Sequence, residues 1–240
     1  MTDATVHAWI GIRNSDTLRV QVATFIDNIR AGNSADQVPL LATIMESFLD
    51  EAITALVLGA ADAMRLHGLT RKVVDVMVST TRSTCHLLSK RVLRKMKNAD
   101  VRELADYMDV LRQKRYDRHG QPLTYTGLPV DDVLMARVDR LRDRMRSAPA
   151  SVQDDEIIDV ILGLIDVCVE HLYVRTLRTL TLGPIAARIV DMGYRTVHHG
   201  AHAMIHRVVP SLTDAQTLTA IEFCYGLLIP PDGTAEPAVV

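Results

Sequence analysis

The sequence is poor in aromatic residues and in cysteine. Its 240 residues include three Phe, one Trp and three Cys, and the cysteines stand far apart, without CxxC or CxxH spacing. This usage argues against a disulfide framework and against a thiolate zinc site. The scarcity of aromatic residues and of strand signals argues against a core built on sheets. We therefore expect reduced, buried cysteines and an all-α fold.

Long uncharged apolar runs are also missing. The most apolar stretch, Ile157 to Val169, is interrupted by Asp159 and Asp166 and is shorter than the ~20 residues of a membrane-spanning helix. Residues 1–13 lack the basic and apolar regions of a secretory signal peptide. We therefore expect a cytoplasmic protein that does not bind a membrane.

Familiar catalytic motifs are absent from the sequence. No nucleophile elbow, P-loop, GxGxxG or HExxH pattern occurs. The sequence therefore identifies no cofactor and no enzyme class.

An internal repeat is present. Residues 15–111 align with residues 131–227 without a gap, at a constant offset of 116, with 17 identities in 97 positions. Identical pairs include Val74-Asp75 with Val190-Asp191, and His86 with His202. The alignment predicts a tandem duplication of one helical unit.

Helix start and stop signals divide each repeat into four helices. We expect helices at about 15–31, 38–67, 70–97 and 99–116, then at about 131–147, 152–182, 184–209 and 212–229. Residues 1–116 form the first repeat, 117–130 a linker or small hairpin, 131–229 the second repeat, and 230–240 a disordered tail. The second helix of each repeat is apolar nearly all round, which predicts two innermost helices related by a pseudo-two-fold axis.

A histidine stripe in the second repeat is the sharpest candidate site. His198, His202 and His206 recur every four residues, and a helix that presents two imidazoles in this way can bind Zn²⁺ or iron. Asp166 and Glu170 on the preceding helix are the expected further metal ligands. The first repeat has Arg82 and Lys90 in place of His198 and His206, and this favours a polar groove over a metal site.

Other polar residues are candidates for lining a ligand site or groove. This set is Asp75, His86, Asp191, Arg195 and His199. Asp50 and Asp166 interrupt the two most apolar helices, so we expect both carboxylates to be buried and paired with a nearby His or Arg. Replacing Asp50 by Ala would then cost roughly 2–4 kcal/mol of stability.

A basic segment ends the first repeat. Residues 65–118 hold 14 Lys and Arg against 6 Asp and Glu, although the net charge of the chain is only −2. The candidate partner surface consists of Lys90, Arg91, Arg94, Lys95, Lys97, Arg112, Lys114 and Arg115. Such a surface could contact nucleic-acid phosphates, but stacking aromatics and known nucleic-acid motifs are missing, so nucleic acid is not favoured.

These observations predict a helical regulatory or interaction protein without catalytic chemistry of its own. We expect a protein partner and consider a homo-oligomer. The first alternative is a metal-binding protein or metal-dependent enzyme centred on the histidine stripe. The second is a nucleic-acid-binding protein that uses residues 90–118.

Overall fold

The computed structural model describes residues 6–93, 96–116, 122–180 and 182–229. The described chain is mostly helical and carries one small four-stranded antiparallel sheet. The expected all-α class is therefore approximately right, and the sheet is a correction to it. Arg94, Lys95, part of the expected linker and the expected tail lie outside the described residues.

The first half of the chain starts with a strand. Its elements are β1 (Val6–Arg13), α1 (Asp16–Arg30), α2 (Val38–Ile53), a π-helical segment (Thr54–Leu58), α3 (Gly59–Ala63), α4 (Gly68–Leu93), a 3-10 turn (Asn98–Val101), α5 (Arg102–Leu111) and β2 (Arg112–Tyr116). The Ser15 hydroxyl accepts a hydrogen bond from the Leu18 amide at 3.2 Å and thereby caps α1.

The second half also starts with a strand. Its elements are β3 (Pro122–Asp131), α6 (Asp132–Ser147), a 3-10 turn (Pro149–Ser151), α7 (Asp154–Val169), a π-helical segment (Glu170–Arg175), α8 (Thr176–Arg178), α9 (Pro184–Val208), a 3-10 turn (Val209–Ser211), α10 (Asp214–Gly226) and β4 (Leu228–Ile229). Asp131 caps α6 by accepting from the Leu134 amide at 2.8 Å. Pro184 occupies the first turn of α9, where its missing N–H costs nothing.

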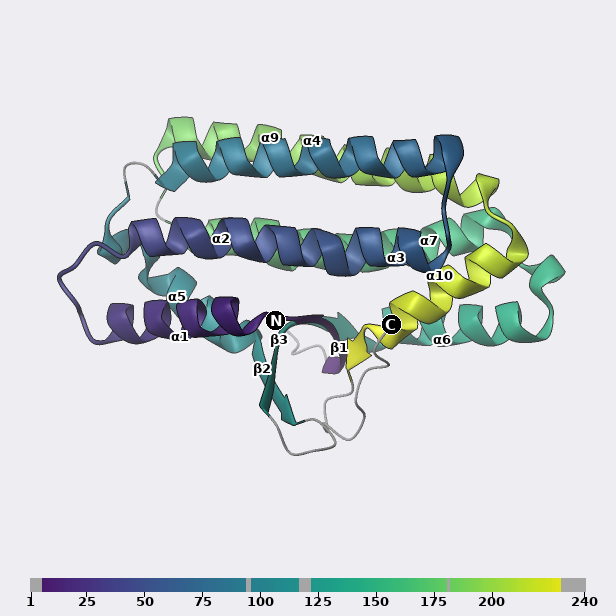
Figure 1. Cartoon of the computed structure of the whole chain (residues 1–240), viewed down its shortest axis with the longest axis horizontal. Helices are drawn as coiled ribbons and strands as arrows, with labels where there is room; N and C mark the ends of the chain where they lie inside the picture. The colour runs from purple at the N-terminus through teal and green to yellow at the C-terminus, as the bar shows by residue number, and fades with distance from the viewer. Residues whose placement is uncertain (1–5, 94–95, 117–121, 181, 230–240) are drawn as a thin grey trace.

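The elements form three layers (Figure 1). Helices α4 and α9 lie side by side in one outer layer and run in opposite directions. Helices α2 and α7 lie in the middle layer, and α1, α5, α6, α10 and the sheet make up the other outer layer. The halves are joined chiefly where β1 and β2 pair with β3 and where α4 packs on α9.

The sheet has the strand order β2-β3-β1-β4. β1 pairs with β3 so that Gly11 lies opposite Gly127 and Ile10 opposite Leu128. Among the described residues, the segment that we expected to be a linker or small hairpin contributes only β3, and β3 pairs with β2, which lies before the expected linker. The predicted helix over 99–116 is wrong beyond Leu111, where the chain enters β2.

One face of the sheet enters the core. Ala8, Ile10 and Ile12 of β1 alternate into it and are at most 4% exposed, as a half-buried strand requires. They belong to the same apolar cluster as Leu128 of β3 and Leu141 of α6. The two halves therefore share a core. Among the described helices, none has the length and apolarity needed to cross a bilayer.

Candidate functional site

A cavity of about 670 Å³ lies between α2, α4, α5 and the π-helical end of α7. Its wall is mostly apolar, and the side chains that line it include Leu41, Phe48, Leu56, Met108, Leu172 and Leu177. Small-molecule sites are typically concave, mostly apolar and of this size. The cavity is therefore the leading candidate for a ligand site.

Both π-helical segments contribute to the cavity wall. Leu56 and Val57 come from the first segment, and Leu172 and Tyr173 come from the second. A π turn takes an extra residue per turn and turns the following side chains to a new face, and such turns are frequent at functional sites. The two segments thus bring apolar side chains of both halves to one space.

Charged residues gather at the rim of this cavity. The Nδ1 atom of His86 lies 3.0 Å from a carboxylate oxygen of Glu46. The Nε atom of Arg82 lies 2.8 Å from Asp50, as an ion pair without a well-aligned hydrogen bond. All four side chains are between 41% and 65% exposed, so they stand where the cavity meets solvent.

The polar groups in the deeper wall are already paired. The Tyr107 hydroxyl lies 2.9 Å from Nδ1 of His171, and the Tyr173 hydroxyl donates to the Val190 carbonyl at 2.8 Å. Burial raises the pKa of Tyr107 to about 12 and lowers the pKa of His171 to about 4. These groups are therefore neutral at pH 7, and the deep wall offers a ligand an essentially apolar surface.

The expected burial of the two helix carboxylates is wrong. The side chain of Asp50 is 65% exposed and that of Asp166 is 50% exposed. An apolar helix can still carry a carboxylate where its surface reaches a cavity rim or a groove. In the first half the partner of this carboxylate is Arg82, whereas His86 pairs with Glu46.

Replacing Asp50 by Ala should therefore cost less than about 1 kcal/mol of unfolding free energy, since exposed ion pairs contribute little. Urea denaturation of the two proteins measures this difference. A loss of 2 kcal/mol or more, on the order expected for breaking a buried pair, would contradict the exposed placement.

A second polar cluster joins α7 to α9. Nε2 of His198 and Nε2 of His202 lie 3.1 Å and 2.8 Å from the same carboxylate oxygen of Asp166. Among the described residues, Asp166, His198 and His202 form the one group of His, Cys, Asp or Glu side chains whose ligand atoms lie close enough together to hold a metal ion. The other two expected ligands are elsewhere: His206 is exposed, and Glu170 pairs with Arg175 and Arg178.

The remaining groove candidates do not meet at one place. His86 lines the large cavity, and Asp75 pairs with Arg71 at 3.0 Å on α4. Asp191 pairs with Arg195 along α9 at 3.1 Å. The Nδ1 atom of His199 lies 2.7 Å from the Arg195 carbonyl.

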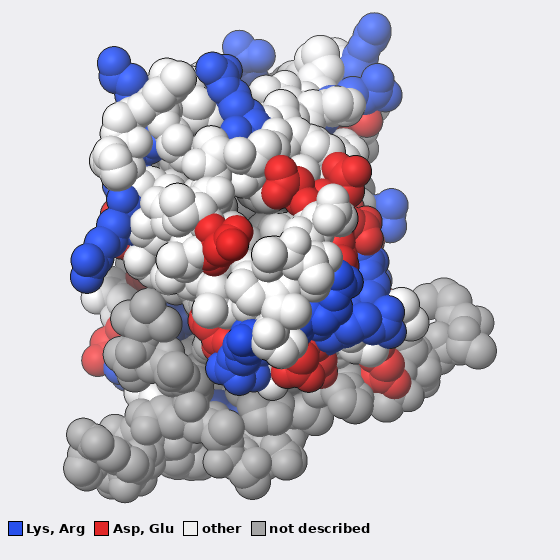
Figure 2. All heavy atoms as spheres, turned by 90° about the vertical axis from the view of Figure 1, so that its right-hand side faces the viewer, with Lys and Arg blue, Asp and Glu red and all other residues white. Residues whose placement is uncertain are grey.

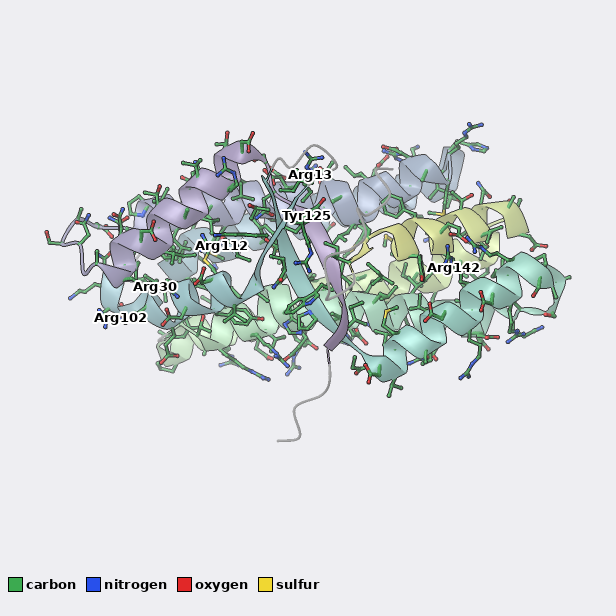
Figure 3. The ribbon with its side chains drawn as sticks, turned by 90° about the horizontal axis from the view of Figure 1, so that it is seen from below. Arg13, Arg30, Arg102, Arg112, Tyr125 and Arg142 are labelled. Atoms are coloured by element: carbon green, nitrogen blue, oxygen red, sulfur yellow. The ribbon has the colours of Figure 1, made fainter. Side chains whose placement is uncertain are left out.

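The described basic residues are split between layers. Lys90 and Arg91 end α4 in one outer layer, whereas Arg112, Lys114 and Arg115 lie on β2 in the other. Seen from below, Arg112 lies near Arg13 and Tyr125 at the sheet (Figure 3). The Arg112 guanidinium is paired with Asp109 at 2.5 Å.

Charges of both signs are also mixed on the end of the molecule next to α6 and α10. Figure 2 shows basic and acidic side chains side by side there, around a broad area of other residues. Glu222 binds both Arg142 and Arg146, and the guanidinium of Arg142 holds the pKa of Glu222 below its usual range. Paired charges of this kind do not make a continuous basic surface.

Sequence reasoning missed most of the cavity. Glu46, Cys85, Tyr107, His171 and Tyr173 were not among the candidates, although all but His171 line it. The apolar pattern of α2 and α7 indicates burial, but the pattern is the same whether neighbouring helices close on it or leave a space. No family model matches the chain, and no curated protein or solved structure was found to be similar to it.

Proposed function

We propose that this protein is a regulatory binding protein, without catalytic chemistry of its own, that encloses an apolar small molecule. The observation that carries the proposal is the cavity of about 670 Å³ with its mostly apolar wall. A solid core would be more stable, because each unfilled space in a core loses packing contacts. A large, mostly apolar cavity that opens to solvent at its rim is consistent with an occupant.

The distribution of polar groups defines the class of ligand. The deep hydroxyls of Tyr107 and Tyr173 are engaged within the protein, whereas Glu46, Asp50, Arg82 and His86 stand half-exposed at the rim. A ligand with one apolar body and one polar end fits this arrangement. Its body would displace water from the apolar wall, and its polar end would meet the charged rim.

Titration with the fluorescent apolar anion 8-anilinonaphthalene-1-sulfonate tests this proposal. Cys85 lines the cavity in the middle of α4, so Cys85→Phe places a phenyl ring inside and should weaken probe binding about tenfold or more. Val76→Phe is the matched control, because Val76 lies on the same helix but is 66% exposed. Equal probe affinity in both variants would show that the probe does not enter the cavity.

We also propose that the chain is a tandem duplication, and the bounds of its helices support this. α2 begins at Val38 and α7 at Asp154, and α4 begins at Gly68 and α9 at Pro184; both pairs differ by the alignment offset of 116. The π-helical segments begin at Thr54 and Glu170, again with this difference. We infer two copies of one unit that starts with a strand and contains a π turn.

The sheet register also supports a pseudo-two-fold axis. Gly11 pairs with Gly127, which is its own equivalent in the other half. Leu228 is the equivalent of Arg112, and Ile10 is the equivalent of Thr126. Arg112 pairs with Thr126, and Leu228 pairs with Ile10 in the same way. Such an axis would pass between the two glycines and between α4 and α9.

A protein partner and a homo-oligomer remain predictions. Large apolar side chains that could bind such a partner are exposed on α4 and α9, and they stand at equivalent positions in the two halves: Leu69 with Ile185, and Val76 with Met192. The basic residues support nucleic-acid binding less well, because the described ones are divided between two layers.

A further inference from the structure

Asp166, His198 and His202 converge from two helices. His198 and His202 are one turn apart on α9, and their ring centroids are 4.1 Å apart. Both Nε2 atoms face one carboxylate oxygen of Asp166 on α7, at 3.1 Å and 2.8 Å. Each imidazole is about one quarter exposed, so the cluster can be reached from solvent.

These distances suit a metal coordination shell as well as they suit hydrogen bonds. Two ligand atoms at about 2.1 Å from an ion lie about 3.0 Å apart at octahedral angles and about 3.4 Å apart at tetrahedral angles. The three ligand atoms lie within 4.8 Å of one another. Small side-chain rotations would therefore bring two nitrogens and one oxygen onto a common ion.

The first half of the chain provides an internal comparison. Its equivalents of Asp166 and His198 are Asp50 and Arg82, and the Arg82 guanidinium lies 2.8 Å from the Asp50 carboxylate. A fixed positive charge thus stands beside the carboxylate there. In the second half the imidazole of His198 replaces this guanidinium, and the imidazole of His202, the equivalent of His86, faces the same carboxylate. Imidazole is a good ligand for transition metals whereas guanidinium is not.

We propose that Asp166, His198 and His202 bind one divalent transition-metal ion, with zinc as the reference case. The two neutral imidazoles and one carboxylate leave one tetrahedral or three octahedral positions open to water or to a further ligand. His206 and Glu170 take no part. This site is separate from the large cavity and does not depend on the proposed apolar ligand.

Direct metal binding tests the proposal on the full chain after removal of metal with EDTA. Zn²⁺ is titrated by calorimetry, and Co²⁺ by the visible absorption of its d–d bands. The wild-type protein should bind one ion per chain, and the ion should raise its thermal midpoint, because ligand binding to the native state stabilises it. The variant His198→Arg should weaken binding about 100-fold or more, since it removes one ligand and adds a positive charge.

His198→Arg is also the variant that should preserve the fold. It installs the residue that the equivalent position in the first half already carries, so its thermal midpoint without metal should equal that of the wild type. His206→Ala and His199→Ala are the matched controls on the same helix and should bind Zn²⁺ normally. The proposal is overturned if the wild-type protein binds no Zn²⁺ or Co²⁺, if His198→Arg or Asp166→Asn binds them as the wild type does, or if His206→Ala abolishes binding.

Discussion

Lowering the pH from 7 to 4 should remove up to about 3 kcal/mol of unfolding free energy through His171 alone. His171 is 6% exposed, and burial lowers its pKa from 6.5 to about 4. Below pH 6.5 the unfolded chain binds a proton that the native protein does not. The stabilisation is therefore complete above pH 6.5 and is lost as the pH falls to 4.

The variant His171→Gln separates this effect from the titration of carboxylates. Urea denaturation at half-unit steps of pH gives the dependence of the unfolding free energy on pH for both proteins. Between pH 6 and 4.5 the wild-type slope should exceed that of the variant by about 1.2 kcal/mol per pH unit, which corresponds to nearly one proton. Parallel curves, or an NMR titration of His171 near pH 6.5, would contradict a neutral buried imidazole.

Substitution of Gly11 by Ala should destabilise the protein by about 2–3 kcal/mol, because it overpacks the centre of the sheet. A Cβ atom at Gly11 would overlap the Cδ1 atom of Ile229 and lie 2.7 Å from its Cγ1. Ile229 is fully buried, and the Gly11 amide donates to the Leu227 carbonyl at 2.8 Å. Moving β1 away from β4 would break the hydrogen bond between the Gly11 amide and the Leu227 carbonyl.

Gly127→Ala is the matched control, since Gly127 is the residue that pairs with Gly11. A Cβ atom there would lie 2.5 Å from Cγ of Gln113 and 3.0 Å from the Trp9 ring. The long Gln113 side chain can rotate away, so this change should cost less, about 1 kcal/mol. Thermal or urea unfolding compares the two variants, and equal losses would show that Ile229 yields as easily as Gln113.

Local signals predicted the helices well. The Ser15 cap and the Gly183-Pro184 joint place the starts of α1 and α9, and these signals act through neighbouring residues. β2 was read as helix because Arg112–Tyr116 contains neither Gly nor Pro. It becomes a strand through its pairing with β3, and such non-local pairing has little trace in a short basic segment.

Local spacing also predicted part of the proposed metal-ligand cluster. Residues spaced by four share a helix face, and His198 and His202 do meet Asp166. His206 is two such steps from His198, which turns it about 80° away. Glu170 does follow Asp166 by one helical turn, but its carboxylate pairs with Arg175 and Arg178 and not with the histidines.

The order of strands in the sheet has a consequence for folding kinetics. Ile10 of β1 pairs with Leu128 on one side and with Leu228 on the other, so the earliest strand in the chain must wait for partners that are synthesised much later. Contacts so distant in sequence form slowly, because a long loop must close first. Until then both edges of β1 present unpaired backbone N–H and C=O groups, and one of its faces presents Ile10 and Ile12. Unpaired edges of this kind join other chains. Association of newly made chains should therefore compete with folding at this strand.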